Sequence, residues 1–325
     1  MNNLLLRQFV ILLSSLLALT IFTFSLTLFF PSEADLLIPQ GNQIQTNLFS
    51  QYVFYLREIL QGHWGVSQAR GSQVFEDFFN HFPATLELSF TAFFFALIIG
   101  LPLGVIAAEN KNKWQDKLIV STTLIGYSMP IFWWGMLLIL LFSVSLGITP
   151  VASRLGFEYD ILPVTGFMLI DTLLSDKPYA IEAFTDALRH LLLPSIVLGT
   201  IPLAVFTRVT RSAMVEVLAS DYIRTAKAKG LSMIRIVWIH ALRNAMLPIL
   251  TIIGLQISIL ITGTLITETI FSWPGIGKWL LEAVYRRDYA TIHGGILAIA
   301  SIVIFTNIMI ELASYYFNPK LRSPK

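Results

Sequence analysis

The feature that most constrains this chain is a series of long apolar runs, of which residues 9–30 are the first and carry no charged side chain. A helix needs about 20 mostly apolar residues to cross the hydrocarbon core of a membrane. Only 13% of the 325 residues are charged and 55% are hydrophobic, whereas a soluble protein is about 25% charged. This composition excludes a soluble globule, which needs a polar exterior, and a disordered chain, which needs low hydrophobicity. The sequence therefore predicts an all-α integral membrane protein.

Six apolar runs are long enough to be membrane-spanning helices. The run at 118–146 is longer than a span requires, and Gly126 and Pro130 are expected to kink it. The run at 191–213 is the weakest of the six, because Pro194 and Pro202 interrupt it. An even number of spans places both termini on the same side of the membrane. The six predicted spans are residues 9–30, 84–108, 118–146, 191–213, 245–267 and 294–313.

The distribution of Lys and Arg indicates which side that is, because cytoplasmic loops of membrane proteins carry an excess of both. With an internal N-terminus, the predicted inner segments hold 14 basic residues in 65 positions, and the outer segments hold 8 in 121. The sequence therefore predicts six transmembrane helices with both termini in the cytoplasm. The expected organisation is an N-terminal transmembrane helix (1–30), a periplasmic segment (31–83), a membrane core (84–319) containing a cytoplasmic loop (207–245), and a cytoplasmic tail (320–325).

The sequence lacks the motifs that mark a nucleotide-binding or zinc-binding protein. It has no cysteine, no phosphate-binding G-x-x-x-x-G-K-[ST] loop and no H-E-x-x-H zinc helix. We therefore expect no cofactor, no metal and no catalytic residue, so that transport energised by ATP would need an ATPase on another chain. The net charge of +2 argues against a nucleic-acid partner.

Ionisable residues inside a membrane usually mark an ion or proton path, and Glu87, Glu268 and Glu311 are the candidates here. All three lie near the ends of predicted spans, and we expect no Arg or Lys at their depth. We interpret them as interfacial or packing carboxylates. This interpretation weakens the hypothesis of a carrier driven by an ion gradient.

The predicted inner loop contains two short helices joined by a glycine. The run from Asp221 favours helix, Lys227 and Lys229 suit its C-terminus, and Gly230 suits the left-handed position beyond it. Ser232 is expected to cap a second helix. This basic and partly apolar pair of helices could rest on anionic lipid headgroups or dock a cytoplasmic partner. Physical arguments alone leave both alternatives open.

The same stretch resembles the EAA loop of ABC-importer permeases, in the branch that transports dipeptides and oligopeptides. The resemblance rests on Arg224-Thr225-Ala226 followed by Gly230, although Arg224 and Thr225 replace the Glu and the first Ala of the general pattern. Within the branch, Lys113-Trp114-Gln115-Asp116 is most similar to the Sap group of peptide permeases. Further motifs extend the resemblance over about residues 83–319, and they are Pro83-Ala84-Thr85-Leu86-Glu87-Leu88, Gly100-Leu101-Pro102-Leu103-Gly104, His240-Ala241-Leu242-Arg243-Asn244-Ala245, Phe271-Ser272-Trp273-Pro274-Gly275-Ile276-Gly277, Arg287-Asp288-Tyr289 and Asn318-Pro319.

The resemblance implies a type I ABC-importer permease, not itself an enzyme, that forms half of a pore in the bacterial inner membrane. It implies a second homologous permease, two cytoplasmic ATPase subunits and a periplasmic substrate-binding protein as partners, alongside the lipid bilayer. Peptides, antimicrobial peptides included, are the implied substrate. A polyamine such as putrescine is the alternative, and an ion-gradient-driven carrier is less favoured. The residues implied to couple to the ATPases are Tyr222, Arg224, Thr225, Ala226, Lys229, Gly230, Leu231, His240 and Asn244.

Two further groups of residues are candidates for the substrate path and the outer face. Thr251, Ser258 and Thr262 are spaced by seven and four along the fifth span, so they share one helix face. They could line a water-filled path or bond a neighbouring helix. The motif at residues 271–277, which we call the outer motif together with the neighbouring Glu268, could be a tight turn anchored in the interface. The family resemblance suggests instead an outer gate or a contact with the binding protein. The candidate residues of that motif are Glu268, Trp273, Pro274 and Gly275.

Overall fold

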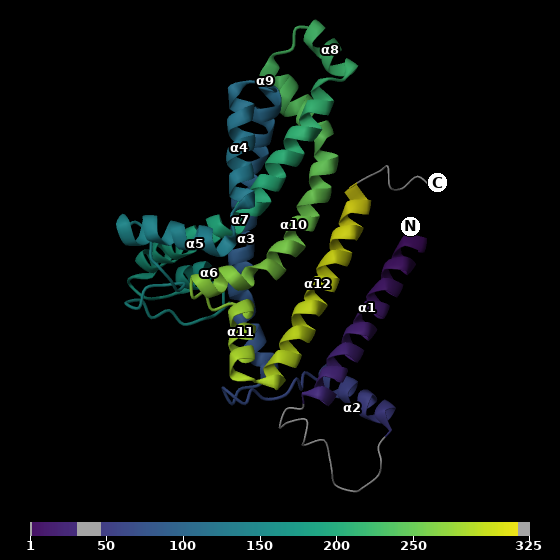
Figure 1. Cartoon of the computed structure of the whole chain (residues 1–325), viewed down its shortest axis with the longest axis vertical. Coiled ribbons are helices and arrows are strands. Elements are labelled where there is room, and N and C mark those ends of the chain that lie inside the picture. Colours follow the sequence, from purple (N-terminus) through teal and green to yellow (C-terminus); the bar gives the residue numbers. More distant parts are fainter. Residues whose placement is uncertain (1, 31–46, 318–325) are drawn as a thin grey trace.

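The computed structural model describes residues 2–30 and 47–317, apart from the side chains of residues 2–5, 261–262 and 313–317. Within these ranges the chain is helical, and the predicted all-α class is confirmed (Figure 1). The helices are α1 (Asn2–Phe29), α2 (Leu48–Leu60), α3 (Val74–Glu109), α4 (Trp114–Ser128), α5 (Ile131–Leu138), the π-helical η2 (Ile139–Ser145), α6 (Met168–Leu174), α7 (Ala180–Leu218), α8 (Asp221–Ala228), α9 (Met233–Arg235), the π-helical η3 (Ile236–Ala241), α10 (Leu242–Ile270), α11 (Ile276–Arg286) and α12 (Tyr289–Phe317).

Among the described residues, five helices or continuous helical stretches are long and apolar enough to cross a membrane, and they comprise α1, α3, α7, α9 to α10, and α12. A sixth span exists if α4 and the α5–η2 helix are counted as one, although the two parts are bent by 106°. The kink expected in the run 118–146 is therefore a break, and it lies at Pro130 rather than at Gly126. Proline lacks an N–H to continue the helix, and it favours an extended conformation at Met129, whose ψ is 134°.

α3 and α7 extend furthest beyond their predicted bounds. α3 begins at Val74, whereas the predicted span begins at residue 84, so α3 enters the segment expected to be periplasmic. α7 is a continuous helix of 39 residues that includes Pro194 and Pro202. Prolines are tolerated in membrane helices because neighbouring groups satisfy the freed carbonyls. Since α7 ends at Leu218, the part of the predicted loop 207–245 that lies outside the long helices is residues 219–241.

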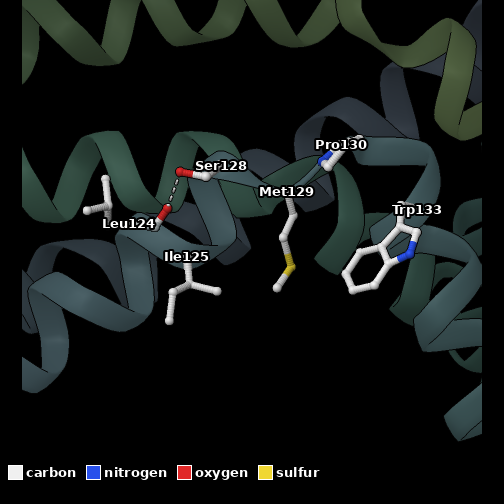
Figure 2. A pocket seen from close by; sticks show the side chains of 6 residues that line it. All are labelled: Leu124, Ile125, Ser128, Met129, Pro130 and Trp133. Atoms are coloured by element: carbon white, nitrogen blue, oxygen red, sulfur yellow. Dashed lines mark hydrogen bonds between the residues drawn. The ribbon is translucent and has the colours of Figure 1, made fainter.

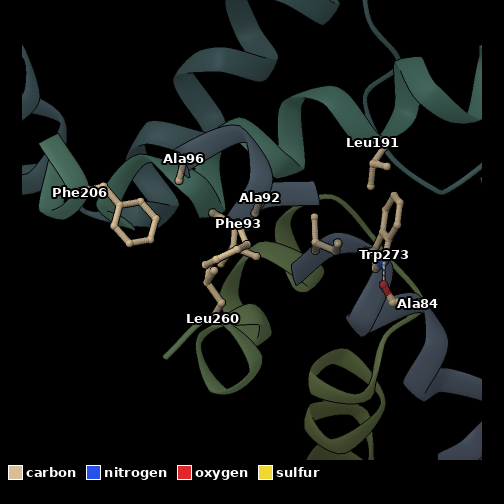
Figure 3. Close-up of a cluster of buried hydrophobic side chains, with 10 residues drawn as sticks. Ala84, Ala92, Phe93, Ala96, Leu191, Phe206, Leu260 and Trp273 are labelled. Carbon is tan, nitrogen blue, oxygen red and sulfur yellow. Dashed lines mark hydrogen bonds between the residues drawn. The ribbon is translucent and has the colours of Figure 1, made fainter. Parts of the chain in front are cut away.

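α3 and α7 form the centre of the molecule, where they pack closely along their length. A Cβ on Gly104 would lie only 2.6 Å from the Cβ of Thr210, so glycine permits this close approach. The Thr207 hydroxyl donates a 3.2 Å hydrogen bond to the carbonyl of Gly100 and so joins the two helices. Figure 3 shows the apolar cluster that continues this contact, and it includes Ala84, Ala92, Phe93, Ala96, Leu191, Phe206, Leu260 and Trp273.

The N-terminal end of α1 and the C-terminal end of α12 lie toward the end of the molecule that carries α8 (Figure 1). The two helices pack together, and Arg7 and Glu311 form an ion pair of 2.7 Å between them. This arrangement agrees with the predicted even number of spans and with two cytoplasmic termini. The predicted tail at 320–325 and the first part of the predicted periplasmic segment, 31–46, lie outside the described residues.

Candidate functional site

The predicted helix–glycine–helix loop is present at the end of the molecule opposite α11 (Figure 1). α8 is followed by Gly230, which has a left-handed φ of +78°. The amide of Gly230 donates to the carbonyl of Lys227 at 2.9 Å, and the amide of Leu231 donates to that of Ala226 at 3.3 Å. These two bonds form a Schellman motif, which ends a helix on a left-handed residue and favours glycine. Ser232 occupies the N-cap position of α9, but its side chain makes no capping bond.

One buried side chain fixes α8 to the rest of the molecule. Ile223 is fully buried in a cluster with residues of α3, α7, η3 and α10. Ala226 and Leu231 are half-buried against the same cluster, so their side chains partly face their own chain. Ile223 is absent from the residues predicted from the sequence, although a single apolar side chain on an otherwise polar helix signals such an anchor. The other buried members of the cluster are Val105, Ala108, Ala213, Met214, Ile236, Val237, Ala241, Ala245 and Ile249.

The rest of the loop presents a basic and partly apolar surface. Tyr222, Arg224, Thr225 and Lys229 are exposed, and the exposed Asn244 amide donates a 2.8 Å hydrogen bond to the Tyr222 hydroxyl. Apolar side chains gathered on an exposed surface mark an interaction site. We call this region the loop surface. It comprises Tyr222, Arg224, Thr225, Lys229, Asn244, the half-buried His240, and the exposed Met233, Ile234, Arg235, Trp238, Ile239 and Arg243.

The three path candidates on α10 differ in their surroundings. Thr251 is exposed, and its hydroxyl donates to the carbonyl of Leu247 in its own helix at 3.2 Å. Ser258 donates a 2.7 Å hydrogen bond to Asn307 of α12, which supports the packing alternative at this position. The side chain of Thr262 lies outside the described residues. A role in the substrate path therefore stays a prediction for these residues. Thr251 is the best candidate, because its side chain is exposed and bonds only within its own helix.

The outer motif forms a buried junction between α3, the end of α10 and the start of α11. Glu268 is fully buried, and it accepts hydrogen bonds from the Thr85 hydroxyl at 2.6 Å and from the Lys278 amide at 2.9 Å. Trp273 is also buried, and its indole N–H donates to the carbonyl of Ala84 at 2.8 Å (Figure 3). These bonds tie three helices together at one point.

Glu268, Trp273 and Gly275 are buried inside one chain and present little surface to a binding protein. Their predicted role, as an outer gate or as a contact with the binding protein, stays a prediction. A Cβ on Gly275 would collide with the Glu268 carboxylate, so the junction requires glycine there. The Gly275 amide donates to the carbonyl of Trp273 at 2.9 Å, as the tight-turn alternative expects. Pro274 is the exposed member of the four candidates.

A buried ion pair beside this junction is absent from the residues predicted from the sequence. Glu87 accepts hydrogen bonds from Arg154 at 2.6 Å and from the Leu169 amide at 2.9 Å. Arg154 also donates to the carbonyl of Gly166 at 2.9 Å and lies 5.5 Å from the centre of the Trp273 ring. The expectation that no Arg or Lys shares the depth of Glu87 is wrong, because an outer loop folds back to supply one. Glu87 itself is the sequence signal that could have predicted such a partner, since a buried charge needs an opposite charge or hydrogen bonds.

Carboxylates also hold the outer segment, by which we mean residues 147–179. Asp171 accepts hydrogen bonds from the amides of Thr165 at 2.7 Å and Gly166 at 2.9 Å, and Asp186 of α7 accepts one from the amide of Gly156 at 2.7 Å. Although the backbone is fixed, large apolar side chains of this segment remain exposed, and they are Ile148, Val151, Phe157, Leu162, Val164, Ile170, Leu173 and Leu174.

The joint between α4 and α5 borders an apolar cavity of about 670 Å³ (Figure 2). Figure 2 shows the side chains of Ile125, Met129 and Trp133 extending to the same side of the joint. The Ser128 hydroxyl donates to the carbonyl of Leu124 at 2.9 Å and so satisfies one carbonyl at the end of α4. The cavity is lined by Leu124, Ile125, Ser128, Met129, Pro130 and Trp133.

Residues 100–323 match the family described as "Binding-protein-dependent transport system inner membrane component". The chain is 55% identical to the di/tripeptide transport system permease protein DppB of Pseudomonas aeruginosa, over 85% of this chain and 81% of that protein. The dipeptide transport system permease protein DppB of Escherichia coli K12 is 48% identical, over 90% and 86%. The putrescine export system permease protein SapB of Escherichia coli K12 is 40% identical, over 97% and 95%.

The fold is similar to that of a solved structure of the MetNI methionine ABC transporter in an inward-facing conformation. The TM-score is 0.52 at 17% identity, over 72% of this chain and 90% of that chain. This likeness concerns the fold alone, and it agrees with the predicted type I permease architecture. Within the peptide branch predicted from the sequence, the two dipeptide permeases share more identity with this chain than the SapB permease does.

Proposed function

Because the chain belongs to the family of binding-protein-dependent transport system inner membrane components, we propose that it forms half of the pore of a bacterial peptide importer. The family comprises multi-pass ABC permease subunits of the inner membrane, which act with ATPases and a substrate-binding protein. The chain is accordingly a transport subunit and not an enzyme. The proposal that the substrate is a peptide rests on the 55% identity to a permease named for di- and tripeptide transport.

Putrescine has weaker support, from a relative of 40% identity. A path for a diamine, like an ion-coupling site, would need carboxylates free to bind cations. The buried carboxylates of Glu87, Glu268 and Asp288 instead accept hydrogen bonds from their own chain. The carboxylate of Asp116 is held by Arg211 at 2.5 Å. Peptide transport is therefore favoured over both a diamine path and an ion-gradient-driven carrier.

A second, homologous permease is the partner that would cover the α4–α5 joint. Helix ends leave carbonyl groups without intrahelical partners, and irregular backbone does not occur in contact with lipid. The joint at Met129 and Pro130 interrupts a run that is apolar enough to lie in the membrane. The neighbouring cavity of about 670 Å³ is apolar and would accept side chains from an adjoining helix. Contact with a second pore half would shield the irregular backbone of the joint from lipid and would fill the cavity.

The loop surface is the part of the chain that would bind an ATPase subunit. α8 stands at the tip of the molecule, beyond the ends of α1 and α12, which disfavours the alternative of lipid headgroups (Figure 1). A displacement of α8 would pass through Ile223 into the cluster that joins α3, α7 and α10. The loop would thereby convert ATPase movement into movement of the spans.

The outer segment is the surface that would receive the substrate-binding protein, in place of the buried outer motif. Phe157 is fully exposed, and Leu162 and Val164 are each 72% exposed. Large exposed apolar side chains on a fixed backbone are typical of a docking surface. Glu158 and Asp160 lie between them in the chain, so a basic patch on the binding protein would complement this surface.

Reconstitution of the whole transporter tests the proposed substrate. The chain would be co-purified with a second permease, two ATPases and the binding protein, and placed in nanodiscs. We expect ATP hydrolysis to rise several-fold with dipeptide and binding protein together, and to stay at its basal rate with putrescine. Binding protein without peptide is the control. Stimulation by putrescine and not by any peptide would overturn the proposal.

A further inference from the structure

α2 is an amphipathic helix whose apolar face is only partly covered. Tyr52 and Tyr55 are half-buried and lie against α1, near its outer end (Figure 1). Phe49, Val53 and Leu60 fall within about 40° of one another around the helix axis, given 3.6 residues per turn. They are 71%, 48% and 85% exposed. α2 therefore presents an uncovered apolar strip, which we define as these three residues.

Contacts with α1 fix the rotation of α2 and so the direction of the strip. The hydroxyl of Tyr52 shares a 2.8 Å hydrogen bond with that of Thr20, and the Tyr55 hydroxyl donates a 2.8 Å bond to Thr23. Both tyrosine rings contact Phe24, with ring centres 5.4 and 5.5 Å apart. α2 cannot roll to bury its strip without breaking these contacts.

The same contacts fix the depth of α2. Thr20 and Thr23 lie nine and six residues before the end of α1 at Phe29, which is about 14 and 9 Å along a helix. Because α1 is apolar enough to span the membrane, α2 lies alongside its outer apolar part rather than beyond it. Phe22 and Leu28 of α1 are themselves 54% and 50% exposed. The strip therefore lies at the depth of exposed apolar side chains of α1.

The polar residues of α2 lie where a helix in the membrane interface needs them. Arg57 is exposed beside the strip, within reach of lipid phosphates for a long basic side chain. Glu58 lies on the far side of the helix, where its carboxylate is 3.0 Å from His63. An apolar strip with a basic residue beside it and a carboxylate on the far side of the helix is typical of helices that lie in the interface plane.

We propose that α2 is an interfacial helix that inserts its strip among the acyl chains of phospholipids in the outer leaflet. Acyl chains are the expected occupant because α2 lies alongside the outer apolar part of α1, at the depth of exposed apolar side chains of that membrane-spanning helix. This proposal goes beyond the transport function, because it depends on neither the substrate nor the partner chains.

Site-directed spin labelling tests the proposal on the full chain, which contains no native cysteine. Single cysteines would replace Phe49, Val53 or Leu60 in the strip, with Ser50→Cys and Glu58→Cys as controls outside it. The labelled chain would be placed in nanodiscs of phosphatidylethanolamine and phosphatidylglycerol. Power saturation with oxygen, which partitions into hydrocarbon, would be compared with a nickel chelate, which stays in water.

We expect oxygen to relax the labels in the strip more strongly than the nickel chelate, and the order to reverse at the two controls. A strip accessible to the nickel chelate would show that it faces water. A strip protected from both reagents would show that protein covers it. Either result overturns the proposal, and neither bears on peptide transport, because the readout involves no ATP and no substrate.

Discussion

The ion pair between Glu87 and Arg154 holds the outer segment on α3, and its side chains are only 5% and 11% exposed. Removing one partner of a buried pair leaves the other charge uncompensated, at a cost of about 3–5 kcal/mol. We expect Arg154→Met to lower the free energy of unfolding by about this amount. The measurement is the denaturant midpoint of the purified chain in detergent, followed by helix content.

Arg7→Met is the matched control, because Arg7 and Glu311 form a pair whose side chains are 60% and 50% exposed. Exposed pairs contribute about 0–1 kcal/mol, so this variant should unfold near the wild-type midpoint. Adding Glu87→Gln to Arg154→Met removes the stranded charge and should recover part of the loss. Equal midpoints for the two arginine variants would contradict the structural role of the buried pair.

The sequence predicts the conformation at Gly230 but not the partner of Glu87, and the range of the interactions explains the difference. A Schellman motif depends on about six consecutive residues, so the local sequence around Lys229 and Gly230 is enough to predict it. Arg154 is 67 positions from Glu87 and reaches it only after an outer loop has folded back. A single sequence contains no period or spacing that links such distant residues.

At the level of elements, the turn between α8 and α9 offers a direct test of coupling. Gly230→Val places a β-branched residue at a φ of +78°, which costs roughly 1–2 kcal/mol or more of backbone strain. A Cβ there meets no atom within 4 Å, so the strain arises in the turn alone. We expect the reconstituted complex to hydrolyse ATP while its dipeptide transport falls at least several-fold.

Gly71→Val is the control for this variant. Gly71 has a φ of +73° and equally open surroundings, but it lies in a turn of the outer loop before α3. The control should therefore suffer similar strain and keep transport. If both variants lose transport equally, or if Gly230→Val transports at the wild-type rate, the turn does not couple the two activities.

Elements were predictable where local pattern and tertiary packing agree. The apolar runs locate α1, α3, α10 and α12, because length and composition decide those spans. Two elements depend on packing instead. α7 continues through Pro194 and Pro202 against α3, and α4 breaks at Pro130. The same residue type permits a continuous helix at one site and a break at another, so surroundings that the sequence does not reveal decide the outcome.

For the whole molecule, the outer segment predicts where the binding protein docks. Phe157 is fully exposed, and truncating an aromatic anchor at the centre of an interface typically costs about 2 kcal/mol or more, roughly a 30-fold loss of affinity. We expect Phe157→Ala to weaken binding of the peptide-loaded binding protein to the transporter in nanodiscs by about this factor. Surface plasmon resonance would measure the change.

Leu60→Ala is the matched control, because Leu60 is 85% exposed but belongs to the strip that we expect to face lipid. It should bind the binding protein with unchanged affinity. An unchanged affinity for Phe157→Ala would instead exclude this part of the outer segment from the docking surface.

α3 and α7 are longer than a membrane is thick. Their 36 and 39 residues correspond to about 54 and 58 Å, against a hydrocarbon core of about 30 Å. One end of this pair contacts the cluster around Ile223. At the other end, the outer segment leads into the start of α7, where Asp186 holds the amide of Gly156. If the pair pivots near its middle, a tilt of about 10° moves each end by roughly 5 Å in opposite directions. A displacement of the cytoplasmic end would then move the outer end in the opposite direction. The two long helices would transmit this motion as rigid bodies, without a chain of side-chain rearrangements between the two ends.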